Sequence, residues 1–148
     1  MSVQLPFDPA SLQPEDRGER RTTLDKEHEE AIEHVRSAFK EAGFGMATEF
    51  SPSELLNEKV DADRDPYYVL GACNPATADE ALDASDGLIG GLFPCNVVIW
   101  EESPGTQVVY HVSIMKIARL VGIAPNTERW ERIVEETGER VERAWSKL

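Results

Sequence analysis

The chain has few of the residues that bind metals or form covalent cross-links. Its 148 residues include two cysteines and three histidines. Neither cysteine has a second cysteine within two to four residues, and structural zinc sites normally contain such pairs. The sequence therefore argues against a structural zinc site, and it assigns no cofactor.

Long hydrophobic runs are also lacking. The longest apolar stretch, residues 87–100, is interrupted by Pro94 and Asn96 and is shorter than the roughly 18 residues of a membrane span. Residues 1–8 lack the basic segment and apolar core of a signal peptide. These absences predict a cytoplasmic protein with no membrane partner, in which both cysteines stay reduced.

Positive charge is scarce. Fifteen Lys and Arg residues stand against 28 Asp and Glu, which gives a formal net charge of −13. The one basic cluster, at Arg17, Arg20 and Arg21, is interspersed with acidic residues, whereas proteins that bind phosphate backbones concentrate cations on one face. The glycine-rich phosphate-binding motifs are absent too. We therefore expect no nucleic-acid partner and no nucleotide site.

The pattern of residues predicts an N-terminal arm at 1–18 and a single α+β domain at 19–148. The arm is proline-rich and shows no periodicity. In the domain, apolar periodicity and capping residues predict alternating strands and helices. Strands are expected at 20–24, 45–50, 67–73, 95–101 and 107–112, and helices at 25–42, 52–59, 74–84, 113–122 and 127–148. This order indicates an antiparallel sheet backed by helices.

The strand expected at 95–101 is apolar on both of its faces. Val97 and Ile99 alternate with Val98 and Trp100, so each face of the sheet carries large apolar side chains. If the helices cover one face, the other needs a second cover, because large exposed apolar patches are uncommon on monomers. The sequence therefore predicts a homodimer.

Two short phrases contain the cysteines, and each cysteine is followed at once by asparagine. Cys73-Asn74 ends one expected strand, and Cys95-Asn96 begins the next. If these strands are antiparallel neighbours, both phrases lie at the same end of the sheet. Cys73 would also precede a helix N-terminus, where the partial positive charge favours thiolates and anions. Cys73, Asn74, Cys95 and Asn96 are thus the candidate ligand-binding residues.

Simpler explanations exist for several members of this set. Asn74 followed by Pro75 is a good helix-capping pair, and cysteine is often an ordinary buried residue. His111 is a weak further ligand, because pairing through the turn at 103–106 places it opposite Val98, on the face away from Cys95.

Three functions are therefore compatible with the sequence. The first is binding of a small ligand, metal or sulfur species at the converged Cys-Asn site. The second is a thiol-dependent redox enzyme that uses Cys73 and Cys95, although no acid or base is placed beside the thiols. The third is a purely structural homodimer module. We favour the first.

The cysteine phrases also carry a family resemblance. Residues 67–75 and 87–101, together with Gly43-Phe44-Gly45, resemble the signature of domain-of-unknown-function family 302 across roughly residues 20–148. The resemblance implies a two-layer α+β fold of the TATA-binding-protein-like type and often a dimer. It implies no activity and no catalytic residues. The acidic composition resembles that of a haloarchaeal branch of the family.

The excess of carboxylates predicts that salt stabilises the protein. Like charges repel one another at low ionic strength, and salt screens that repulsion. The midpoint unfolding temperature should rise by several degrees between dilute buffer and molar potassium chloride, as followed by circular dichroism. An unchanged midpoint would contradict the salt-adapted interpretation.

Overall fold

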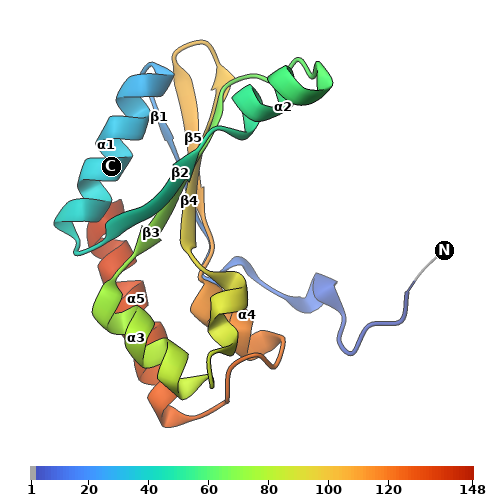
Figure 1. Cartoon of the computed structure of the whole chain (residues 1–148). Coiled ribbons are helices and arrows are strands. Elements are labelled where there is room, and N and C mark those ends of the chain that lie inside the picture. The colour runs from blue at the N-terminus through green and yellow to red at the C-terminus, as the bar shows by residue number, and fades with distance from the viewer. Residues whose placement is uncertain (1–2) are drawn as a thin grey trace.

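Five antiparallel strands form the centre of the structure, a computed structural model in which residues 3–148 are described (Figure 1). The strand order is β1-β5-β4-β3-β2, so the N-terminal strand lies at one edge and β2 at the other. The strands are β1 (Arg20–Leu24), β2 (Gly45–Phe50), β3 (Tyr67–Cys73), β4 (Cys95–Ser103) and β5 (Thr106–His111).

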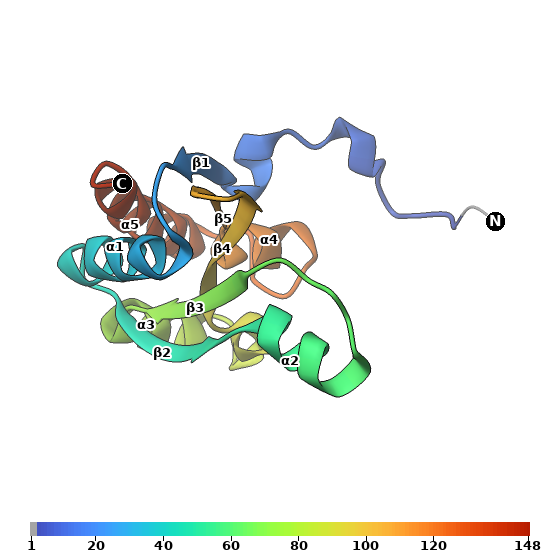
Figure 2. The same cartoon turned by 90° about the horizontal axis from the view of Figure 1, so that it is seen from above.

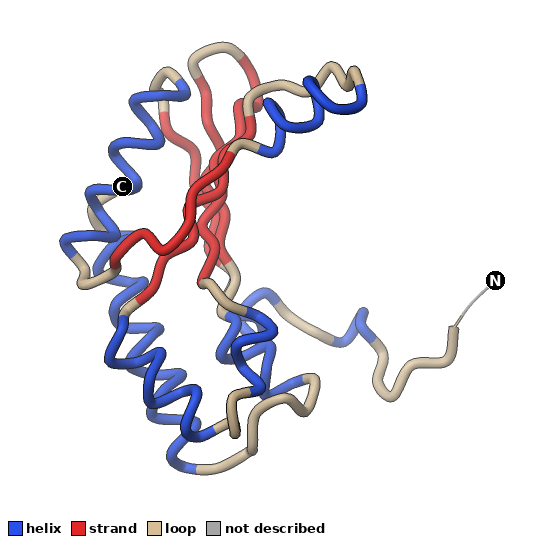
Figure 3. Tube along the Cα trace, viewed as in Figure 1, coloured by secondary structure: helices blue, strands red, loops and turns tan. Residues whose placement is uncertain are grey.

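Most of the helices pack on one face of this sheet or extend beyond one of its ends, and one short helix lies on the other side (Figure 3). Helix α1 contacts the strands directly, and α5 packs against α1, α3 and α4. The helices are α1 (His28–Glu41), α2 (Pro52–Val60), α3 (Pro75–Ala84), α4 (Ile114–Leu120) and α5 (Glu128–Trp145), with short 3₁₀ turns η1 (Pro9–Ser11), η2 (Pro14–Arg17) and η3 (Leu88–Leu92). The expected α+β architecture with a helix-backed antiparallel sheet is confirmed.

The two faces of the sheet differ in their cover. Val97 and Ile99 are fully buried beneath α1, whereas Val98 and Trp100 are half-buried on the opposite face. On that face the Trp100 ring stacks on the ring of Tyr67, with centroids 5.7 Å apart. Figure 2 shows α1 and α5 on one side of the sheet and α2 on the other. That a second copy covers the aromatic face stays a prediction.

The β4–β5 hairpin corrects the expected position of His111. The register shifts between Glu101 and Ser103, so His111 pairs with Val97 and not with Val98. One extra residue in β4 moves His111 to the face that Cys95 shares, because side chains alternate with a period of two. Its Nδ1–H donates to the Asn96 carbonyl at 2.8 Å, and burial lowers the pKa of His111.

The first helix begins later than expected. The N-cap position is Glu27, whose backbone is extended, and α1 starts at His28 and not at residue 25. Helices α2 and α5 begin within one residue of the expected positions, and the hydroxyls of Ser51 and Thr127 accept hydrogen bonds from their first turns.

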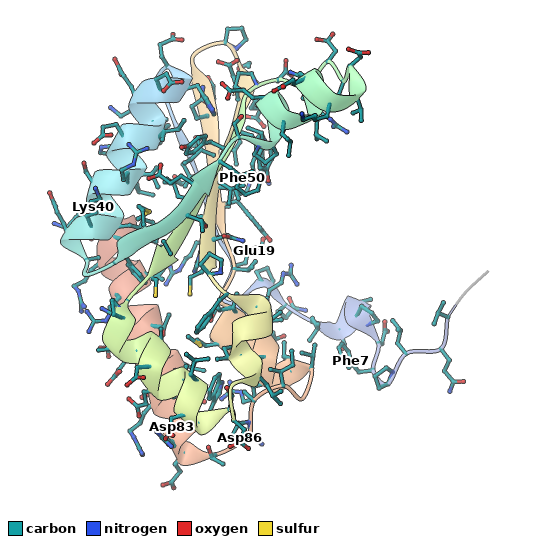
Figure 4. All side chains as sticks on the ribbon, in the orientation of Figure 1. Phe7, Glu19, Lys40, Phe50, Asp83 and Asp86 are labelled. Carbon is teal, nitrogen blue, oxygen red and sulfur yellow. The ribbon has the colours of Figure 1, made fainter. Side chains whose placement is uncertain are left out.

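The N-terminal segment touches the rest of the chain through η2. The Ser113 N–H donates to the Arg17 carbonyl at 2.8 Å, and Lys116 Nζ donates to the Glu15 carbonyl at 2.7 Å. Farther toward the N-terminus the chain leads away from the sheet, and Phe7 lies on this outlying part (Figure 4). Among residues 3–148, no helix is long and apolar enough to cross a bilayer.

Gly71, near the end of β3, has no room for a side chain. A Cβ there would lie 2.3 Å from Thr48 Oγ1 and 2.6 Å from Pro94 Cγ. We therefore expect Gly71→Ala to destabilise the protein by about 1–3 kcal/mol through overpacking. Gly138→Ala is the control: it lies in α5 with open space around it, and should stabilise by about 0.5–1 kcal/mol. Urea unfolding measures the free energy of unfolding of both variants. Equal changes in the two variants would contradict the close packing around Gly71.

Candidate functional site

Strand pairing brings the two cysteine phrases together. In the β3–β4 ladder, Ala72 lies opposite Cys95 and Gly71 lies opposite Asn96. The strand that ends at Cys73 and the strand that begins at Cys95 are thus antiparallel neighbours. The expected meeting of both phrases at one end of the sheet is confirmed.

A pocket of about 190 Å³ opens at this end of the sheet. It lies between the first half of β2, the end of β3, the start of β4, and helices α3, α4 and α5. Its walls are mostly apolar, and the aromatic, proline and methionine side chains among them are Phe44, Phe93, Pro94 and Met115. Its polar and sulfur-containing lining residues are Thr48, Cys73, Asn74, Thr77, Cys95, Thr137 and Arg140.

Both thiols line this pocket and both are free, but their environments differ. Cys95 is buried, whereas Cys73 is partly exposed. Burial raises the pKa of Cys95 to about 12, because the thiolate would lose its hydration, and the nearby Cys73 adds to this effect. The Cys95 side chain is therefore a neutral thiol at physiological pH.

Asn74 has a structural role at the rim of the pocket. Its Oδ1 accepts a hydrogen bond from the Thr77 N–H at 3.0 Å, which caps helix α3. Its Nδ2 donates to the Gly43 carbonyl at 2.8 Å, which ties the α1–β2 junction to α3. The capping explanation is confirmed, and one amide N–H remains to meet a ligand.

Asn96 does not join the other candidates. Its side chain is exposed and is not part of the pocket lining. Because residues alternate along β4, Asn96 lies on the opposite face from Cys95, across from Gly71. The expected convergence of two thiols and two carboxamides is therefore observed for Cys73, Cys95 and Asn74, and is wrong for Asn96.

Two polar residues of α5 complete the pocket, and the sequence analysis did not single them out as site residues. Thr137 is buried, and its hydroxyl has no hydrogen-bond partner among the described residues. Arg140 is half-buried, and its Nε likewise has none. Arg140 follows Thr137 by one helical turn, at the edge of the apolar stripe of α5. The sequence signal that could have indicated Arg140 is a charged residue at a helix position that otherwise faces the core.

Gly43 allows Arg140 to approach. Its φ of +94° is in the left-handed region that favours glycine. Gly43 directly follows Ala42, the C-cap residue of α1, a position at which helices often end in this conformation. A Cβ at Gly43 would lie 2.8 Å from Arg140 Nη1 and 3.6 Å from Asn74 Nδ2. The glycine thus leaves the space in which the guanidinium lies beside the Asn74 amide.

Metal ligands are not gathered in this region. Within residues 3–148, no group of three or more His, Cys, Asp or Glu side chains is placed to hold a metal ion. His111, although on the same face of the sheet as Cys95, does not line this pocket; it lines a smaller hollow of about 80 Å³ beside α4 and α5, and Thr137 lies between the two. The pocket is therefore lined by two cysteines, one asparagine, three threonines and one arginine.

The fold and its pocket define a small α+β domain in which helices back an antiparallel sheet. The chain belongs to the family described as Domain of unknown function DUF302, whose model matches residues 20–148. It is similar in structure to an uncharacterized conserved DUF302 protein from Bacillus stearothermophilus, with a TM-score of 0.74 and 24% sequence identity. That similarity covers 87% of this chain and 96% of the other. No curated protein matches the chain.

The burial of Cys95 predicts slow alkylation. In the Cys73→Ser variant, Cys95 should react with iodoacetamide near neutral pH at least about a hundredfold more slowly than in urea, because the thiolate is the nucleophile. Its rate should rise as the pH approaches 12, since the pKa of Cys95 is raised. The Cys95→Ser variant, which leaves the partly exposed Cys73, is the control and should react faster. Mass spectrometry follows both, and equal rates would contradict the assigned burial.

Proposed function

We propose that this protein is a small binding domain that takes a ligand with an apolar body into the pocket at the end of β3 and β4. The observation that carries the proposal is the pocket itself, with a volume of about 190 Å³ and mainly apolar walls. An apolar cavity of about 150 Å³ is large enough to bind benzene in another protein. A ligand with a body of about six carbons is therefore of suitable size.

The thiols support binding better than they support redox catalysis. The pKa of Cys95, raised to about 12, works against a role as a resolving thiolate. No His, Asp, Glu or Lys is among the residues that line the pocket, so no side chain there is suited to exchange protons with a reacting thiol near neutral pH. In our proposal Cys73 and Cys95 contact the ligand as soft, polarisable surface.

A pocket-filling variant tests this proposal. Ala78→Leu adds apolar volume to the α3 wall of the pocket, and Ala76→Leu makes the same change at an exposed position of the same helix. Amide chemical shifts of the full chain would be recorded while 1-hexanol and hexanoate are added separately.

Wild type and Ala76→Leu should bind at least one of the two probes, with shifts at residues around the pocket. Ala78→Leu should weaken that binding by about tenfold or more, since the ligand would have to displace the new side chain. Binding that is unchanged in Ala78→Leu, or that is absent from wild type, would overturn the proposal. Native mass spectrometry of protein purified without chelator would show in addition whether a ligand is retained.

A further inference from the structure

We infer that the ligand of this pocket is a carboxylate on a small apolar body, held by Arg140 and Thr137. This inference rests on the proposed function, because it concerns the same pocket. It adds the chemical class of the ligand and the two residues of α5 that select it.

Arg140 is a cation without a partner in a chain that is rich in anions. No ion pair or hydrogen bond joins its guanidinium to any of residues 3–148, and its Nε is inaccessible to solvent. By contrast, Arg36 and Arg129 each lie between two carboxylates, and Arg132, which also has no ion pair among these residues, is exposed. With 28 Asp and Glu residues against 15 Lys and Arg, a cation left unpaired beside a pocket is available for a ligand.

Thr137 supplies a second donor beside this cation. Only 4% of the residue is exposed, and its Oγ1 has no partner among the described residues. Buried hydroxyls are nearly always hydrogen-bonded, because an unpaired one loses its hydration without compensation. Thr137 and Arg140 are three residues apart on α5 and both line the pocket, so one bound group can meet both.

The composition of the pocket selects the sign and the size of the bound group. No acidic side chain lines it, so an anion meets no local repulsion, whereas a cationic ligand would face Arg140. A carboxylate has two oxygens that can accept from a guanidinium and a hydroxyl together. Phosphate carries more charge than the single cation of this mainly apolar pocket neutralises. A monocarboxylate therefore fits best.

Two probes of equal chain length isolate the contribution of charge. Hexanoate and 1-hexanol share a six-carbon chain and differ in the head group, and calorimetric titration gives the affinity of each for the full wild-type chain. We expect hexanoate to bind about tenfold or more tightly than 1-hexanol, because hydrogen bonds to charged groups are the stronger ones.

Variants at Arg140 connect this preference to one residue. Arg140→Met keeps an unbranched, flexible side chain but removes the charge and the hydrogen-bond donors, and it should abolish the preference for hexanoate. Arg140→Lys should retain part of it, because the charge remains but the planar fork is lost. Arg132→Met is the matched control: it removes an equal charge from an exposed position of the same helix and should leave the preference intact. Circular dichroism would show that each variant is folded.

The outcomes separate this inference from the proposed function. Equal affinities of wild type for hexanoate and 1-hexanol would overturn the inference and leave the apolar binding function standing. A hexanoate preference that survives in Arg140→Met would overturn the assignment to Arg140. Failure of wild type to bind either probe would overturn both proposals. The comparison of the two probes on wild type needs no variant. It therefore tests the carboxylate preference even if an Arg140 variant fails to fold.

Discussion

The pairing of β3 with β4 is the constraint on which the pocket depends. It places Ala72 opposite Cys95, so two thiols that are 22 positions apart in the chain line one pocket. Gly71 makes this arrangement possible, because Thr48 and Pro94 occupy the space that a side chain would need. A slip of one residue would exchange the two faces of the strand and move Cys95 out of the pocket.

Helix α5 serves the hydrophobic core and the pocket with the same face. Trp130, fully buried, packs in the core near α4 and donates its Nε1–H to the Met115 carbonyl at 2.9 Å. Two turns farther along, Thr137 and Arg140 line the pocket. Because core packing fixes the rotation of the helix about its axis, it also fixes where these two polar groups lie. The same core packing that stabilises the fold therefore sets the position of the pocket residues on α5.

Burial has opposite consequences for the groups around the pocket. It keeps Cys95 as a neutral thiol, because a thiolate there would lose its hydration without gaining a partner. Arg140, by contrast, is a cation whose buried Nε has no partner among the described residues, so it gains most from an anion. A mainly apolar pocket beside the Arg140 cation therefore favours binding of an anion over thiol chemistry.

Local sequence patterns determined the elements of this fold, and tertiary structure decided the composition of its site. The strands, the cap at Asn74 and the meeting of the cysteine phrases were predictable, because periodicity and capping are properties of short segments. The register of β5 was not, since one extra residue in β4 reverses the face on which His111 lies. Arg140 joined the site for a similar reason: only the packing of α5 against Gly43, at the opposite end of the domain's sequence, brings an ordinary surface residue type beside a buried pocket.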